Sequence, residues 1–126
     1  MDMTNYLSQG YFDENNRPYK ELYLDWAQSI ADTLARKGMS KGALRRFYGQ
    51  VKGLQPIIEK DFEGQKHRLY PIIPHAHYGV NKENSTIPAE FITFIERNVF
   101  LAEQDIRHFQ MFIEHFQCVV AYFRAG

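Results

Sequence analysis

The sequence predicts an all-α protein, folded as a single compact bundle of about five helices. Apolar residues recur at helical spacing in several stretches, and no stretch alternates for long with the period of two that marks a strand. A chain of 126 residues can bury one hydrophobic core but not two. We therefore expect residues 1–18 to form an irregular N-terminal arm and residues 19–126 to form one helical-bundle domain.

Two helices are predicted in the first half of the chain. The first runs from about Tyr19 to Lys37 and should end at Gly38, since glycine favours the backbone conformation that follows a helix. Ser40 is typical of the residue that caps a helix start, and Pro56 should end or kink the second helix. Apolar residues mark the two buried faces: Leu22, Trp26, Ile30 and Leu34, then Leu44, Phe47, Val51 and Leu54.

The second half is predicted to hold a bent or broken segment followed by two helices. Residues 57–68 lack a clear apolar period, and Pro71 and Pro74 interrupt the stretch after them. Residues 79–87 are expected to form an exposed loop, after which Pro88 stands where a helix start tolerates proline. The last two helices have apolar faces of Phe91, Phe94, Ile95 and Val99, then Ile106, Phe109, Ile113, Phe116, Val120 and Phe123.

No pattern of residues points to catalysis, and we expect no catalytic residue, metal or cofactor. His75 and His77 would face different directions on a helix, and His108 and His115 would lie roughly 10 Å apart along one. Cys118 stands among apolar residues, which predicts a buried and inert thiol. Because no phosphate-binding loop or dinucleotide fingerprint occurs either, an enzyme is the least favoured class.

The chain has no long apolar run and only one cysteine. Its longest apolar run, residues 118–123, is far shorter than the roughly 20 residues that span a bilayer. The first five residues lack the pattern of a signal peptide. One cysteine cannot form an intramolecular disulfide, which suits a reducing compartment. These features predict a soluble, cytoplasmic protein.

The net charge is zero, but the charges are segregated along the chain. Residues 36–82 hold ten Lys or Arg and three acids, a local charge of +7, and the rest carries −7. Within this stretch, residues 36–52 hold six cations and no acid. Phosphate binding depends on local potential, so such a chain can bind RNA with one face. The alternative interpretation is that these cations lie on solvated helix faces that carry charges of one sign by chance.

The second predicted helix carries the most informative cations. Lys41, Arg45 and Lys52 should share one side of it, because they are four and seven residues apart, and Arg46 should flank that side. Such a row can contact phosphates without reading bases. Our candidate RNA-binding residues are Lys37, Lys41, Arg45, Arg46, Lys52, Lys66 and Arg68.

Several stretches resemble a known family, the small subunit of the type III-A CRISPR (Csm) effector complex. They are Gly10 to Asn16 leading through Arg17-Pro18 into a helix, Leu44-Arg45-Arg46-Phe47-Tyr48 followed by Val51-Lys52, Pro88-Ala89-Glu90-Phe91, and the ending Phe116 to Arg124. The sequence departs from the family pattern in residues 69–79, where Pro74 and histidines stand in place of a lysine- and alanine-rich helix.

The resemblance implies a non-catalytic subunit that lines the channel holding guide RNA paired to target RNA, in antiviral defence. Several copies would stack along the backbone subunits, while the catalytic steps belong to other subunits. Recognition would use the backbone and shape of the duplex. Two alternatives stay open: the small subunit of a related type III-B (Cmr) complex, and a helical protein-interaction adaptor without an RNA role. The candidate interface aromatics are Tyr6, Tyr11, Phe12 and Tyr78.

Overall fold

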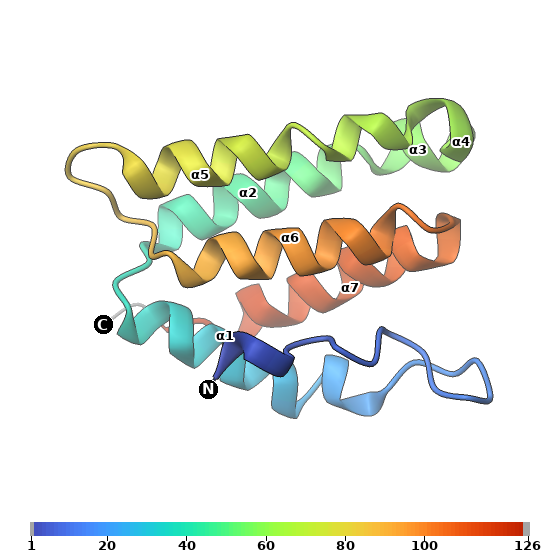
Figure 1. The fold of residues 1–126 in the computed structure, drawn as a ribbon, viewed down its shortest axis with the longest axis horizontal. Helices are drawn as coiled ribbons and strands as arrows, with labels where there is room; N and C mark the ends of the chain where they lie inside the picture. The colour runs from blue at the N-terminus through green and yellow to red at the C-terminus, as the bar shows by residue number, and fades with distance from the viewer. Residues whose placement is uncertain (1, 125–126) are drawn as a thin grey trace.

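Five helices of ten residues or more build the described part of the chain, and shorter helical segments lie between some of them (Figure 1). The computed structural model describes residues 2–124, and no strand occurs within them beyond an isolated bridge between Phe12 and Pro18. The predicted all-α bundle is confirmed. The α-helices are α1 (Asp25–Arg36), α2 (Lys41–Gly53), α3 (Gln55–Lys60), α4 (Phe62–Gln65), α5 (Ile72–Asn81), α6 (Glu90–Ala102) and α7 (Ile106–Tyr122), with 3₁₀ turns η1 (Met3–Asn5), η2 (Lys20–Leu22) and η3 (Lys66–Leu69).

Helix α7 is the centre of the bundle. It packs against α1, α2, α3 and α6, while α5 lies on the other side of α6. In Figure 1, α2 and α5 form one layer, and α1 with the N-terminal segment lies on the opposite side of α6 and α7. Because α7 has neighbours on several sides, its buried face is wider than the predicted stripe. It includes Met111, Phe112 and His115, whereas Ile106 and Val120 are only half-buried.

The first helix begins later than its apolar spacing predicts. A 3₁₀ turn occupies residues 20–22, and α1 begins only at Asp25, after Leu24 departs from helical backbone angles (φ −119°, ψ −103°). The Leu22 carbonyl accepts a hydrogen bond from the ring of His115, 2.7 Å away, so it is engaged by α7. This tertiary contact takes the place of a regular helical bond. Trp26, predicted to be a core residue, is only half-buried.

Local signals at the junction of α1 and α2 act as predicted. Gly38 adopts a positive φ of 97°, and the amide of Met39 donates to the Leu34 carbonyl, which closes the end of α1 in a Schellman motif. Ser40 caps α2, its Oγ accepting from the amide of Ala43 at 3.1 Å. Three of the four predicted core positions are confirmed, since Leu44, Phe47 and Val51 are buried, whereas Leu54 lies just past the end of α2 and is only half-buried.

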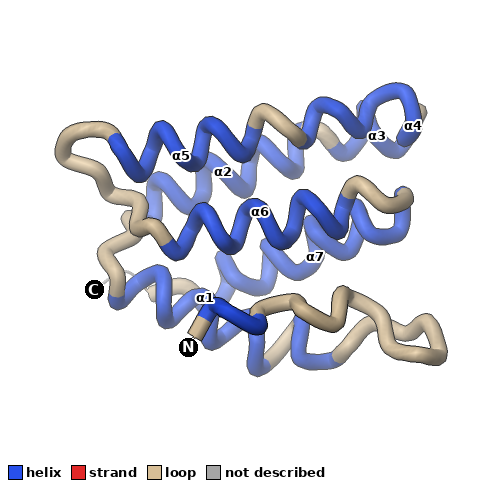
Figure 2. The backbone as a smooth tube through the Cα atoms, viewed as in Figure 1, coloured by secondary structure: helices blue, strands red, loops and turns tan. Residues whose placement is uncertain are grey.

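The proline-containing segment is broken into short pieces, as expected, but its last piece is longer than predicted. Asp61 has extended backbone angles and separates α3 from α4. Pro71 immediately precedes α5 and Pro74 lies in its first turn, where a missing amide costs no helical hydrogen bond. Helix α5 therefore continues to Asn81, and the loop predicted over residues 79–87 begins only at Lys82 (Figure 2).

The irregular N-terminal segment contributes two tyrosines to the core. Tyr6 and Tyr11 are 2% and 0% exposed, so neither is available as an interface aromatic. The Tyr11 hydroxyl donates to Asn98 Oδ1, and Asn98 Nδ2 donates to the Tyr6 hydroxyl at 3.0 Å. That hydroxyl lies 2.6 Å from Nε2 of His115. The network joins residues 2–24 to α6 and α7.

Candidate nucleic-acid interface

The outer side of α2 presents the cations that the sequence singled out. An α-helix turns by about 100° per residue, so Lys41, Arg45 and Lys52 lie within an arc of about 40° on one side of α2. Arg46 lies about 100° further round the helix axis. All four side chains are exposed. The row from Lys41 to Lys52 extends about 17 Å along the helix axis. The sequence prediction of one cationic helix side therefore agrees with where the structure places these residues.

Three of these cations have no internal partner that would neutralise them. Within residues 2–124, Lys41, Arg45 and Arg46 take part in no ion pair, and none donates a side-chain hydrogen bond. Lys52 differs, since its Nζ donates to Gln55 Oε1 at 2.6 Å, but that partner is uncharged. Within the described residues, no acid therefore offsets the positive charge of Lys41, Arg45 and Arg46 through an ion pair.

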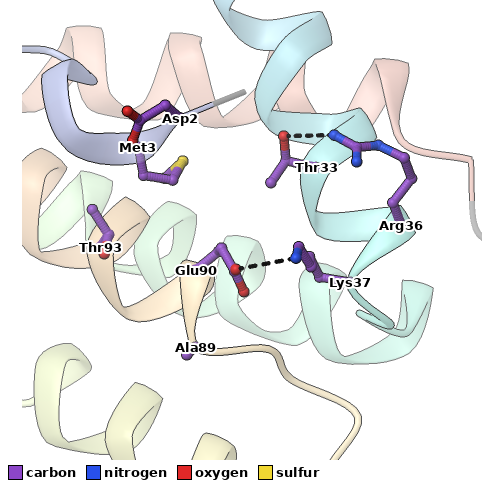
Figure 3. A pocket seen from close by; sticks show the side chains of 8 residues that line it. All are labelled: Asp2, Met3, Thr33, Arg36, Lys37, Ala89, Glu90 and Thr93. Atoms are coloured by element: carbon purple, nitrogen blue, oxygen red, sulfur yellow. Dashed lines mark hydrogen bonds and ion pairs between the residues drawn. The ribbon is translucent and has the colours of Figure 1, made fainter.

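Lys37 lies at the end of α1, in an open hollow of about 510 Å³ beside the start of α6 (Figure 3). Its ammonium is 4.0 Å from a carboxylate oxygen of Glu90, and the neighbouring Arg36 donates to Thr33 Oγ1 at 3.4 Å. Asp2 also lines the hollow. Because two cations and two acids meet here, Lys37 contributes less to the local potential than the α2 cations do.

Lys66 and Arg68 lie in the separate turn η3, away from the α2 row along the chain. Lys66 is half-buried, 3.5 Å from the carboxylate of Glu63, and its ammonium lies 5.8 Å from the ring centroid of Phe62. Arg68 is exposed and donates through Nε to Gln65 Oε1 at 2.6 Å. The structure therefore brings four of the seven candidates together on α2 and places the other three elsewhere.

Helix α5 extends the acid-free surface beyond α2. Of the α-helices in residues 2–124, α2 and α5 alone carry no Asp or Glu. The two lie side by side in Figure 1, and the side chains of Gln50 and His75 are joined by a hydrogen bond of 2.9 Å. Tyr78 of α5 is exposed. Sequence reasoning noted His75 and Tyr78 singly but could not pair α5 with α2, because that contact joins residues 25 apart in sequence.

Other candidate chemistries find little support in the described part of the chain. Across residues 2–124 no group of three or more His, Cys, Asp or Glu is placed to hold a metal ion. Cys118 is half-buried rather than fully buried, and burial, together with the nearby Glu114, raises the pKa of its thiol. In the same residues, we find no helix whose length and apolar character would let it cross a membrane.

Three acids in and just after α6 are engaged with neighbours at the end of α1, on α5 and just after η3. Glu90, Glu96 and Glu103 are all half-buried. Glu96 lies 3.9 Å from the ring of His77, and Glu103 accepts a 2.6 Å hydrogen bond from the Tyr70 hydroxyl. This hydrogen bond is the main cause of the raised pKa of Tyr70. Glu96 therefore links α6 to α5, and Glu90 lies beside Lys37 at the end of α1, and neither forms an ion pair with the α2 row.

The described residues thus form a small helical bundle with one exposed cationic helix, α2. A family model described as Csm2 Type III-A matches residues 17–126, most of the chain. The chain therefore belongs to the Csm2 family, the small subunits of type III-A CRISPR (Csm) complexes. No curated protein and no solved structure matches it.

Proposed function

We propose that this chain is a non-catalytic subunit that lines the channel of its Csm complex and binds the guide RNA–target RNA duplex through phosphate contacts. The observation that carries the proposal is a set of exposed cations on α2, Lys41, Arg45 and Arg46, which no acid of the described residues neutralises. The role would be in antiviral defence in the cytoplasm, with target cleavage carried out by other subunits.

The geometry of α2 supports backbone recognition rather than base reading. A straight row of about 17 Å follows one face of a helix and offers point charges and guanidinium groups. Side chains cannot read the deep, narrow major groove of A-form RNA, so a protein recognises such a duplex through its phosphates and 2′-hydroxyls. Guide pairing already supplies the choice of sequence, which makes sequence-tolerant contacts sufficient.

Membership of the family supports a set of partners in addition to guide and target RNA. These partners would be the backbone subunits, the large signature subunit and neighbouring copies of this chain. The charge distribution suits several partners at once, because α1 carries Asp25 and Asp32 on a side of the bundle away from α2. A chain with zero net charge and one cationic side can therefore present a protein-facing surface and an RNA-facing surface.

The test is the double charge reversal Arg45→Glu with Arg46→Glu, measured by binding of an RNA duplex over a range of salt concentrations. We expect the affinity for the duplex to fall about 10-fold or more. The magnitude of the slope of log K against log salt should decrease by about 2, because each lost phosphate contact reduces that slope by about 1. The matched control reverses Arg17 and Lys20, which are also exposed and change the net charge equally. The slope of log K against log salt for this control variant should equal that of the unmodified chain.

An unchanged slope in the folded Arg45/Arg46 variant would contradict the proposal. That result would favour the helical adaptor, whose partner surfaces need no cationic row. Circular dichroism and urea unfolding of both variants establish that any loss of binding comes from charge and not from unfolding. Because both side chains of the test pair are exposed and without internal ion pairs, we expect their stability to change by less than about 0.5 kcal/mol.

A further inference from the structure

The pairing of α2 with α5 sets a register between their exposed side chains. The helices run in opposite directions in Figure 1, and the Gln50–His75 hydrogen bond fixes one point of contact. One turn further along α5 stands Tyr78, and one turn back along α2 stands Arg46. Tyr78 and Arg46 therefore stand about one helical turn from the Gln50–His75 contact, on the same side of it along the antiparallel helices.

Tyr78 is the most exposed of the large apolar side chains in the described residues, at 71%. Its hydroxyl makes no hydrogen bond within residues 2–124, so neither face nor edge of the ring is committed to the fold. Beside it, the amide nitrogen of Gln50 can only donate, so Nδ1 of His75 accepts and the ring proton sits on Nε2. An aromatic ring, an outward N–H and a guanidinium group are thus placed within about one helical turn of the same contact.

We propose that Tyr78 is a stacking platform for an unpaired nucleotide of bound RNA, with Arg46 on the adjoining phosphate and His75 beside the base edge. This inference rests on the proposed function, since it assigns a second contact to the same RNA-facing surface. Aromatic side chains stack on bases whose faces are free, whereas a paired duplex already stacks its bases internally. Tyr78 therefore favours single-stranded RNA, and the α2 cations serve both forms.

Charge complementarity singles out RNA as the occupant of the Tyr78 surface. Phe100 on α6 is also exposed, at 51%, but Glu96 and Glu103 stand four residues before it and three after it on the same helix side. Two carboxylates repel a phosphate chain, so the surroundings of Phe100 do not suit RNA. Tyr78 instead stands on a helix without any acid of its own, and Glu96 of α6 meets that helix at His77, about 100° round the axis from Tyr78. Phe100 is therefore the matched control for loss of an exposed aromatic ring.

The experiment compares the full chain with the Tyr78→Ala, Tyr78→Phe and Phe100→Ala variants at one salt concentration. The probes are a single-stranded oligouridine of about ten nucleotides and a fully paired RNA duplex of the same length. We expect Tyr78→Ala to weaken single-strand binding about 5- to 100-fold and to leave duplex binding within about twofold. Tyr78→Phe should bind as the unmodified chain does, because the ring carries the stacking, and Phe100→Ala should change neither affinity.

Each contrary outcome has a distinct meaning. If Tyr78→Ala binds the single strand as tightly as the unmodified chain does, this inference is overturned. The proposal of duplex binding would still stand if the Arg45/Arg46 reversal weakens binding of the duplex. Equal weakening by Tyr78→Ala and Phe100→Ala would also overturn it. Loss of assembly with other Csm subunits, with RNA binding intact, would assign Tyr78 to a protein contact instead. Failure of the unmodified chain to bind either RNA would contradict both proposals.

Discussion

His115 connects three segments of the chain through its two ring nitrogens. Nδ1 donates to the Leu22 carbonyl before α1, which leaves Nε2 to accept from the Tyr6 hydroxyl. Burial lowers the pKa of His115 to about 4, although the bond to Leu22 opposes that change. The ring is therefore neutral in the folded protein under ordinary conditions, and protonation would break the bond that Nε2 accepts.

The lowered pKa of His115 predicts that stability falls in mild acid. In the unfolded chain a histidine takes up a proton below about pH 6.5, whereas folded His115 resists protonation until about pH 4. The unfolded state thus binds more protons in this window, so stability is fully present above pH 6.5 and is lost as pH falls. We expect the free energy of unfolding to drop by about 2 kcal/mol between pH 7.5 and pH 5, measured by urea titration.

The His115→Gln variant identifies the source of this pH dependence. Glutamine does not titrate, so the drop between pH 7.5 and pH 5 should nearly vanish, although the variant is less stable at every pH. His67→Gln is the matched control, because His67 is exposed in η3 and its replacement should keep the slope. A His115→Gln protein with the full slope would show that another group carries the effect.

At the scale of elements, two glycines should respond oppositely to the same substitution. Gly38 ends α1 with φ at 97°, a conformation that alanine adopts only with strain, so Gly38→Ala should destabilise by about 1 kcal/mol. Gly49 lies inside α2, and an added Cβ there would meet nothing within 4 Å. Gly49→Ala should therefore stabilise by up to about 1 kcal/mol. Urea unfolding of both variants measures the two signs, and a loss of stability in both would contradict the helix argument.

Element boundaries could be predicted from sequence where a local signal sets them. Gly38 and Ser40 bound α1 and α2 through backbone angles and a cap bond that involve only near neighbours. The start of α1 could not be predicted, because the Leu22 carbonyl is held by His115, 93 residues away. The end of α5 was also predicted wrongly: Pro74 suggested a break but lies in the first turn, where the helix tolerates it.

The same distinction applies to the candidate site of the whole molecule. Lys41, Arg45 and Lys52 share a side because one helix carries them, so spacing alone predicts their grouping. The proximity of α5 depends on packing through α6 and on a single hydrogen bond to α2, which spacing does not reveal. Glu63 stands three residues before Lys66, so sequence spacing already indicates that pair, whereas the pairing of Lys37 with Glu90 becomes apparent only in the folded chain.

The N-terminal segment should be required for the stability of the whole molecule, although the family match begins only at residue 17. Deleting the residues before 17 removes the buried rings of Tyr6 and Tyr11 and leaves Asn98 and His115 without their hydroxyl partners. We expect the free energy of unfolding to fall by about 5 kcal/mol or more, from lost burial and unpaired polar groups. The full chain with Tyr6→Phe and Tyr11→Phe keeps the rings and should lose only about 2–4 kcal/mol. A truncated chain that unfolds at the same urea concentration as the full one would show that this segment is a peripheral arm.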